Sequence, residues 1–415
     1  MSRRRLDVLS GDFFPAYVVW ELTLRCDHAC AHCGSRASKA RPDELSTEEA
    51  LRVVSELAAL GAREVVLIGG EAYLHSGFLQ VVQALAEAGI HPTLTTGGRG
   101  VTAELARAMH QAGLLQVSVS VDGLQATHDR MRRLTGSFRY ATAALEHCRE
   151  AGIRITANTN VNRLNQADLE PLFEHLQACG ITAWQVQLTA PLGRAADRTE
   201  LILQPWELLD LMPRVAALKR RAYAQGILLL PGNNLGYFGE EEALLRSTLP
   251  NGRDHFSGCQ AGRYVLGVES NGAVKGCPSL QTAAYVGGNL RQRSLRALWE
   301  STPELASMRS RTVEALWGFC RSCDFAATCL GGCSFTAHAL LGRPGNNPYC
   351  HYRARVHARQ GVRERLVPVV PASGQPFDNG RFEIVVEPAD APLPAPLPAE
   401  QLVQLSWGKQ RSQLV

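Results

Sequence analysis

A helix, a glycine and a strand follow one another five times within the first 190 residues of this 415-residue chain. Glycine tolerates the positive φ that ends a helix at low cost, so each glycine is expected just beyond a helix C-terminus. The five are Gly61, Gly89, Gly113, Gly152 and Gly180. Together with a first strand at 16–23, the repeat predicts six parallel strands separated by helices, which is an α/β fold.

Two α/β architectures fit this alternation, an incomplete (β/α)6 barrel and a doubly wound open sheet. Polar residues favour the barrel, because they follow the strands at their C-terminal ends, where barrel active sites are built. These residues are Cys26 to Cys33, Gly69 to Glu71, Thr95 to Gly98, Ser118, Ser120 and Asp122, Asn158 and Asn160, and Gln185 and Gln187. We therefore expect a partial barrel of parallel strands with its active site at one mouth.

The chain is too long for one hydrophobic core, since single cores stop growing at roughly 250–300 residues. We expect an N-terminal segment at 1–15, the partial barrel at 16–230, a linker at 231–258, a small cysteine-rich domain at 259–365 and a proline-rich tail at 366–415. A helix is expected at 205–225 and a strand at 381–387. No function is predicted for the tail.

Charge and hydropathy narrow the range of partners. The 43 basic residues nearly balance the 39 acidic ones, and a net charge of +4 without a basic stripe argues against nucleic-acid binding. The N-terminus carries no secretory signal and no segment approaches 18 apolar residues, so no membrane partner is expected. We expect a cytoplasmic protein, and in that reducing compartment clustered cysteines bind metals or do redox chemistry rather than form disulfides.

Three of the twelve cysteines, Cys26, Cys30 and Cys33, form a C-x3-C-x2-C pattern directly after the first strand. Three thiolates on one short loop can bind three irons of a cubane cluster and leave the fourth iron open to an external molecule. A zinc site completed by His28 or His32 is the alternative. The iron–sulfur interpretation is favoured because the cysteines and a glycine motif occur together where barrel chemistry belongs.

Over roughly residues 16–190 these motifs resemble the radical SAM superfamily. The resemblance implies that the three cysteines bind a 4Fe-4S cluster, and that its open iron is chelated by S-adenosylmethionine, whose reductive cleavage makes a 5′-deoxyadenosyl radical. It also implies cofactor-binding roles for Gly69, Gly70 and Glu71 of a GGE segment, and for Thr96, Ser120, Asp122, Arg132 and Asn160. The stretch HDRMRRLTGSF is similar to one branch of the superfamily, except that Arg133 stands where that branch often has glycine.

A second group of seven cysteines resembles the SPASM extension, which in that family holds two auxiliary iron–sulfur clusters. The resemblance implies one cluster on Cys259, Cys277 and Cys333, and a second on Cys320, Cys323, Cys329 and Cys350. The first set has three cysteines, so its fourth ligand is a residue of another type, or its iron is open. A zinc-ribbon module is the alternative, but seven thiolates divide poorly into complete zinc sites. The isolated Cys148 and Cys179 are expected to be buried structural residues.

The resemblance implies an enzyme whose radical abstracts hydrogen from an unactivated carbon, with auxiliary clusters that accept the electron or bind substrate. We expect a precursor peptide as substrate, assisted by a separate leader-recognition protein, and an electron donor such as flavodoxin or ferredoxin. Sulfatase maturation is disfavoured, because Pro278 occupies the position of that group's acidic residue.

Two other functions remain open. A small-molecule enzyme that acts on a tetrapyrrole is the first, because haem-pathway enzymes resemble this chain in the W-E-x-T-x-x-C opening at residues 20–26. A zinc or iron–sulfur scaffold without catalysis is the second. It gives no function to the GGE segment or to the SVD motif, Ser120 to Asp122, at the barrel mouth.

Overall fold

The computed structural model describes residues 13–392, and the expectations for 1–12 and for the tail beyond 392 lie outside the described residues. Its main element is a ten-stranded sheet with the order β10-β9-β8-β1-β2-β3-β4-β5-β6-β7. Seven parallel strands follow one another in chain order, so the sheet is wound in one direction, as in a barrel, and does not reverse as a doubly wound sheet does. The prediction of a partial parallel barrel is confirmed.

The barrel strands are short and regular. They are β1 (Tyr17–Thr23), β2 (Glu64–Gly69), β3 (His91–Thr96), β4 (Gln116–Ser120), β5 (Arg154–Val161), β6 (Ala183–Leu188) and β7 (Leu228–Pro231). The seventh strand pairs with β6 and was not among the six expected. Because β7 and β10 are both edges of the sheet, the barrel does not close.

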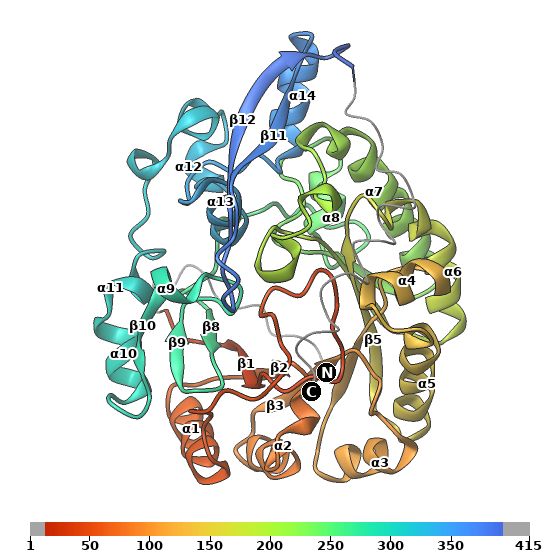
Figure 1. Ribbon diagram of the computed structural model, residues 1–415, viewed down its shortest axis with the longest axis vertical. Helices are drawn as coiled ribbons and strands as arrows, with labels where there is room; N and C mark the ends of the chain where they lie inside the picture. The colour runs from red at the N-terminus through yellow and green to blue at the C-terminus, as the bar shows by residue number, and fades with distance from the viewer. Residues whose placement is uncertain (1–12, 393–415) are drawn as a thin grey trace.

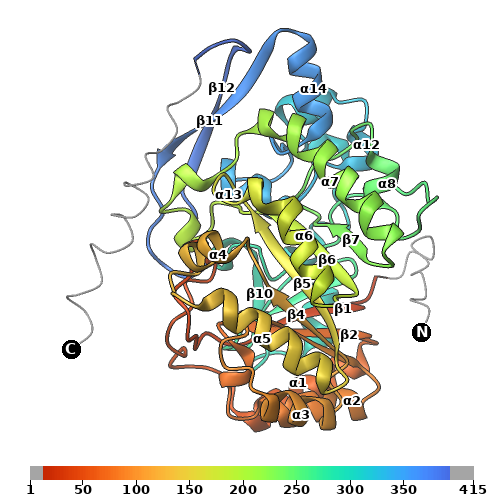
Figure 2. The ribbon, with the colours of Figure 1, turned by 90° about the vertical axis from the view of Figure 1, so that its right-hand side faces the viewer.

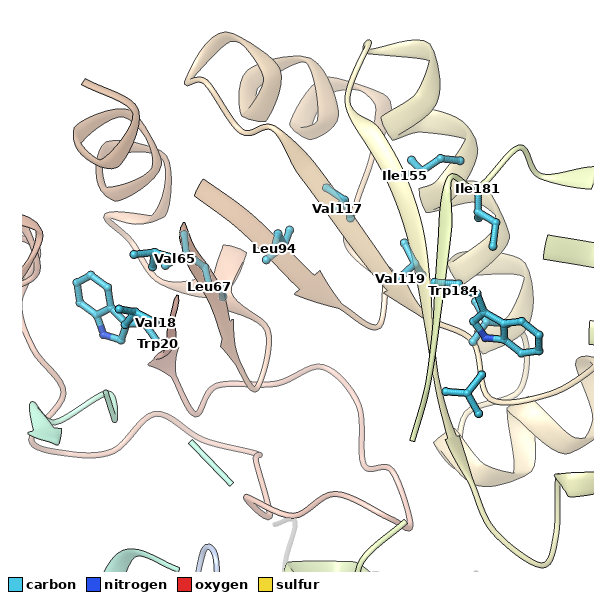
Figure 3. Packing of buried hydrophobic residues seen from close by; sticks show 14 of the residues in the cluster. Val18, Trp20, Val65, Leu67, Leu94, Val117, Val119, Ile155, Ile181 and Trp184 are labelled. Carbon is cyan, nitrogen blue, oxygen red and sulfur yellow. The ribbon is translucent and has the colours of Figure 1, made fainter. Parts of the chain in front are cut away.

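Side chains alternate along each strand, and this alternation decides which of them reach the interior. In β1, Val18 and Trp20 are fully buried in the core that Figure 3 shows, while Val19 and Glu21 line the central cavity. On β5 and β6 the cavity side carries Asn158, Asn160, Gln185 and Gln187, and the core side carries Ile155, Ala157, Trp184 and Val186. The polar residues singled out in the sequence therefore face inward together.

Helices cover the outer face of the barrel strands (Figures 1 and 2). They are α1 (Thr47–Ala59), α2 (Phe78–Glu87), α3 (Ala103–Gln111), α5 (Ser137–Glu150), α6 (Leu169–Ala178) and α7 (Leu208–Ala224). The short α4 (Gln125–Arg132) lies at the mouth of the barrel, where the amide of Ala31 donates to the carbonyl oxygen of Met131. The five glycines of the repeat all have positive φ just after a helix, as expected. No described helix is long and apolar enough to cross a membrane.

The cysteine-rich region continues the barrel sheet. Strand β8 (Val265–Val268) pairs in parallel with β1, and β9 (Ala273–Lys275) and β10 (Val286–Asn289) follow in antiparallel order. Short helices complete the region: α9 (Thr282–Tyr285), α10 (Leu295–Ser301), α11 (Pro303–Ala306), α12 (Ala326–Cys329), α13 (Ser334–Leu341) and α14 (His351–Arg359). The stretch 231–258 is mostly irregular and contains α8 (Glu242–Arg246).

After α14 the chain forms a two-stranded hairpin of β11 (Val362–Val370) and β12 (Arg381–Pro388). The strand expected at 381–387 is therefore confirmed as β12. In Figure 1 the hairpin runs from α14 at the top of the molecule down to the centre, where it ends beside β8 and β9.

Buried charges join the barrel to the cysteine-rich region. Arg41 contacts Glu21 of β1 at 3.1 Å and Glu269, which follows β8, at 3.0 Å. Lys275 of β9 binds Glu269 at 2.7 Å. Burial raises the pKa of Glu21, and Arg41 opposes that rise. These four side chains hold the two parts of the sheet in register.

Candidate functional site

The C-terminal ends of the barrel strands surround a cavity of about 400 Å³. The cysteine loop between β1 and α1, the GGE segment after β2 and the inward residues of β5 and β6 all contribute to its lining. Residues from the cysteine-rich region and from the C-terminal hairpin complete it, including Pro278, Phe335 and Phe377. This volume lies within the range of small-molecule sites.

The three cysteines of the first group lie together on the loop at the cavity. Their thiols interact with one another, and burial raises the pKa of both Cys26 and Cys30. Arg132 donates a hydrogen bond from Nη1 to Cys30 Sγ at 3.6 Å. The backbone of the loop is fixed by Arg194, which donates from Nε to the carbonyl oxygen of Cys30 at 2.7 Å. Burial favours the neutral thiols, and a bound cluster would offset the cost of forming thiolates there, so the three cysteines fit an iron–sulfur cluster.

The GGE segment packs directly on this loop. A Cβ on Gly69 would lie 2.1 Å from the carbonyl oxygen of Thr23, and one on Gly70 would lie 2.2 Å from that of Arg25, so only glycine fits at either position. Glu71 is buried, and it accepts hydrogen bonds from Thr96 Oγ1 and from the amide of Gly97, the latter at 2.7 Å. Burial raises the pKa of Glu71 to about 7, although these hydrogen bonds oppose it.

Asp122 and Arg132 form a buried ion pair at 2.6 Å, and His32 Nε2 lies 3.2 Å from the same carboxylate oxygen. Burial would raise the pKa of Asp122, but Arg132 and His32 hold it well below its usual range. Asp122 also accepts a hydrogen bond at 2.9 Å from the amide of Asn160. Two of the predicted contacts, Asp122 and Arg132, are therefore partners of one another.

Several buried polar atoms at the cavity have no hydrogen-bond partner among the described residues. They include Nδ1 of His32, Nε of Arg132 and Oδ1 of Asn158. Buried polar groups are normally satisfied, so unpartnered ones that line a cavity indicate a polar ligand. Ser120 lines the same cavity, and Gln187 donates to Asn160 Oδ1 at 3.0 Å. All the predicted cofactor-binding residues except Asp122 line this cavity, and Asp122 is buried behind Arg132 and His32.

The geometry around the first cysteines does not favour zinc. Ligand atoms of Cys26, Asp27, His28 and Glu71 lie within 4.8 Å of one another. The ring of His28 is already engaged, because Nδ1 lies 2.8 Å from Asp27 Oδ1 and Nε2 lies 3.5 Å from Ser137 Oγ. The predicted zinc ligand His32 faces Asp122 instead.

The seven later cysteines fall into two groups. Cys277 and Cys333 interact electrostatically with Cys259, and burial raises the pKa of Cys277 to about 12 and that of Cys333 to about 11. Cys320 and Cys323 both interact with Cys329, whose pKa burial raises to about 12, and Cys350 interacts with Cys329 and Cys320. Tyr285 and Phe335 pack against the first group, and Phe325, Tyr237 and Tyr352 pack against the second. Cys333 also packs against the cluster that contains Cys329 and Cys350, so it lies between the two groups, and the three-plus-four division of ligands stays a prediction.

Two remaining cysteines differ from one another. Cys148 is fully buried in α5, as expected, whereas Cys179 is only partly buried at the end of α6.

Arg133 ends α4 with a φ of 55°, which explains why a related branch places glycine there.

Sequence reasoning missed several residues of the site. Arg194, Asn234, Phe335 and Phe377 line the cavity, but each lies beyond the last helix–strand repeat. Asn234 bonds the backbone of Leu188 with both side-chain atoms. No motif marks these positions, since they reach the cavity only through long-range packing.

Comparison with known proteins agrees with these motifs. A model of the radical SAM superfamily matches residues 20–176, and one of the SPASM iron–sulfur cluster-binding domain matches residues 259–324. The chain is 29% identical over 349 residues to the AdoMet-dependent heme synthase of Methanosarcina barkeri, covering 82% of this chain and 97% of that protein.

A maturase is similar to this chain to a comparable extent. The mycofactocin maturase MftC of Mycolicibacterium smegmatis is 29% identical over 352 residues, covering 81% of this chain and 82% of that protein. In fold, the chain is similar to SuiB of Streptococcus suis, solved with S-adenosylmethionine bound, with a TM-score of 0.61 and 16% identity over 78% of this chain and 73% of that one.

Proposed function

From the premise that the chain belongs to the radical SAM superfamily and carries a SPASM iron–sulfur domain, we propose that this enzyme modifies a peptide at the barrel mouth. Its cofactors are iron–sulfur clusters and S-adenosylmethionine. When bound, they supply a 5′-deoxyadenosyl radical that can abstract hydrogen from an unactivated carbon, which no side chain does. The residues of this chain bind and orient the reactants and exclude water.

In this proposal Cys26, Cys30 and Cys33 hold the radical-generating cluster. Glu71 receives the ammonium group of S-adenosylmethionine, whose positive charge favours the ionised carboxylate, and its two oxygens are already oriented by Thr96 and Gly97. The glycines before Glu71 let the segment approach the cysteine loop closely. The unpartnered Nε of Arg132 suits a carboxylate, since guanidinium binds that group well. Ser120, Asp122 and Asn160 supply the remaining polar contacts.

The auxiliary cysteines divide into two sites in the proposal. Cys259, Cys277 and Cys333 hold one cluster, and Cys320, Cys323, Cys329 and Cys350 hold the other. Both sets are thiols in buried surroundings, where a bound metal offsets the cost of forming thiolates. They offer an exit for the electron that a substrate radical loses.

The observation that carries the choice of a peptide is the neutral amide lining of the cavity. Asn158, Gln185 and Gln187 face it from two adjacent strands, and Asn158 Oδ1 lacks a partner among the described residues. Carboxamides donate and accept hydrogen bonds, as peptide groups do.

The cations of the cavity support the same choice. A tetrapyrrole carries carboxylate side chains, which need cationic partners. Of the two arginines among the described lining residues, Arg132 pairs with Asp122, and Arg194 donates to the backbone carbonyls of Cys30 and Ala37. Little positive charge remains for two or more carboxylates.

Tetrapyrrole chemistry is the second candidate, and the similarity to a heme synthase favours it. The W-E-x-T opening adds little to it. Trp20 is fully buried in the core, and Glu21 accepts hydrogen bonds from Arg41 and Ser270. Both residues have structural roles that do not depend on the class of substrate.

One set of assays tests the enzyme and its substrate. The protein is purified without oxygen, its iron, sulfide and zinc are assayed, and 5′-deoxyadenosine is measured after addition of dithionite and S-adenosylmethionine. Cys30→Ala should abolish the nucleoside, whereas Cys179→Ala, outside both cysteine groups, should not. Zinc without sulfide, or no nucleoside from the wild-type protein after reconstitution, would contradict the proposal.

The substrate is then tested by mass spectrometry with two probes. One is the peptide encoded by a short reading frame beside the gene, and the other is iron coproporphyrin III. A mass change in the peptide alone supports the proposal, and a change in the porphyrin alone selects the second candidate. Cys320→Ala should retain nucleoside formation and lose product, if the clusters carry the electron away.

A further inference from the structure

The tip of the β11–β12 hairpin, residues 371–380, forms one wall of the cavity. Half of the tip residues are exposed, but Phe377 is 9% exposed and lines the cavity. Figure 1 shows the hairpin descending from α14 to the centre of the molecule, beside the loop that carries the first cysteines. The tip therefore borders that loop although the two are about 340 positions apart in the sequence. Arg36 Nε donates a hydrogen bond to the carbonyl oxygen of Gln375 across this contact.

Backbone and charge contacts hold the tip on the cysteine loop. The amide of Phe377 donates to the carbonyl of Gly34 at 3.2 Å, and the amide of Gly193 donates to that of Asp378 at 2.7 Å. Arg36 Nε donates to Asp378 Oδ1 at 2.9 Å. Arg36 stands three residues after Cys33, so these contacts fix the tip to the cysteine loop.

The aromatic ring of Phe377 is fixed on its other side by a cation. The Lys275 ammonium lies 4.2 Å from the ring centroid. That ammonium is held in turn by Glu269 and by the carbonyl of Leu280, both at 2.7 Å. Lys275 precedes Cys277 by two residues, so the ring stands between the first cysteine loop and the segment that carries Cys277.

The backbone of Phe377 is strained. Its φ is 56°, a left-handed value that bulky residues rarely adopt. Such residues cost about 1–3 kcal/mol, persist only where the surroundings impose them, and cluster at functional sites. Glycine would take this conformation without strain. A phenylalanine here therefore costs stability, and its ring is held in the cavity wall by the contacts above.

We propose that Phe377 is a specificity-determining residue, whose ring limits the size of the substrate side chain that enters the cavity. The inference rests on the proposed function, because it takes a peptide as the substrate. The ring cannot turn aside without losing the contact with Lys275. Small substrate side chains fit beside the Phe377 ring, and large aromatic ones collide with it.

The test compares Phe377→Gly with Val385→Ala. Glycine removes the ring at a φ that glycine prefers, so folding is retained. Val385 lies on the same hairpin, is 38% exposed and does not line the cavity, which makes it the matched control. Glycine-rich peptides with one central alanine, valine, tyrosine or tryptophan are titrated calorimetrically into each reconstituted holoenzyme with S-adenosylmethionine present.

In the wild type and in Val385→Ala, the alanine peptide should bind more tightly than the tryptophan peptide. In Phe377→Gly the ratio of their Kd values should shift toward tryptophan by about 10–200-fold, the discrimination that pocket packing supplies. An unchanged ratio in Phe377→Gly, or an equal shift in Val385→Ala, overturns the role of Phe377. If no peptide binds any of the three proteins, this role falls together with the proposed function.

A second readout separates the two hypotheses. The same peptides are made with a deuterated central residue, and deuterium in 5′-deoxyadenosine is measured after reduction. Peptides that bind with the expected size preference and transfer no deuterium would contradict the proposed hydrogen abstraction, while the selection of size by Phe377 would stand.

Discussion

Burial and neighbouring charges together set the pKa values of single residues at the barrel mouth. Glu71, Asp122 and His128 all lie within this region and are at most 3% exposed, yet their pKa values move in different directions. Burial dominates for Glu71 and His128, whereas Arg132 and His32 outweigh it for Asp122. Each residue therefore affects the unfolding free energy over its own pH range. The range of His128 can be tested directly.

His128 is expected to make the protein sensitive to mild acid. Its Nδ1 accepts from the amide of Asp122 at 3.0 Å and its Nε2 lies 3.1 Å from Ser137 Oγ, an arrangement that holds the ring neutral. Burial and the nearby Arg132 lower its pKa from 6.5 to about 3. Between these pH values the unfolded chain binds a proton that the folded chain does not, so the unfolding free energy falls as the pH falls, by up to ~1.4 kcal/mol per pH unit.

The measurement is the urea midpoint of the holoprotein at several pH values from 7.5 down to 5. His128→Asn keeps an acceptor near Asp122 and cannot titrate there, so its midpoint should fall less steeply. His110→Asn, at an exposed position, should follow the wild type. Parallel curves for His128→Asn and the wild type would refute this role.

At the scale of elements, the segment after β6 braces the cysteine loop. Gly193, in the turn Gly193–Ala195, has a φ of 56°, and a Cβ there would lie 2.2 Å from the carbonyl oxygen of Gly34 and 2.5 Å from that of Cys33. Arg194 from the same turn bonds the loop at Cys30. The turn and the loop are therefore packed backbone to backbone, with no room for a side chain between them.

Gly193→Ala is expected to displace the cysteine loop and to weaken cluster binding there. With three clusters in the proposed protein, loss of one removes about a third of the iron after reconstitution. Gly226→Ala is the matched control, because Gly226 has a φ of 71° and a Cβ added there would meet no heavy atom of the described residues within 4 Å. It should retain full iron at a cost of about 1–2 kcal/mol in stability. Equal iron contents in the two variants would show that the turn does not brace the loop.

For the whole molecule, the junction between the barrel and the cysteine-rich region combines a strand pair with a buried ion network. Strands β1 and β8 pair over Tyr17–Trp20 and Val265–Val268, and Arg41 connects Glu21 to Glu269 beside them. The tip of the C-terminal hairpin meets the same cavity from a third direction. The cavity therefore exists only when these three parts of the chain are assembled.

Arg41→Met is expected to destabilise the whole protein. It leaves the buried Glu21 without its cationic partner, and breaking a buried ion pair in this way costs about 3–5 kcal/mol. Arg107→Met, which removes an exposed pair with Glu104, should cost about 0–1 kcal/mol. Anaerobic thermal unfolding of both variants provides the comparison, and equal shifts in Tm would contradict the structural role of the junction.

The sequence by itself determined the barrel and the chemistry-bearing residues of the site. Hydrophobic periodicity and the terminal glycines are local signals, and parallel strands carry their C-terminal ends to one edge, so Cys26, Glu71, Asp122 and Asn160 were expected to meet. Cysteine spacing is likewise local, and it marked both later groups without any knowledge of the fold.

Only the tertiary structure decided how the cavity is enclosed. The pairing of β8 with β1, the bracing by Gly193 and the placement of Phe377 each join residues far apart in the chain, and no local pattern encodes such contacts. The ion pair of Asp122 with Arg132 spans few residues, but it forms only because α4 places Arg132 beside the end of β4. Long-range packing selects these neighbours, because burial and charge pairing are satisfied only in the assembled fold.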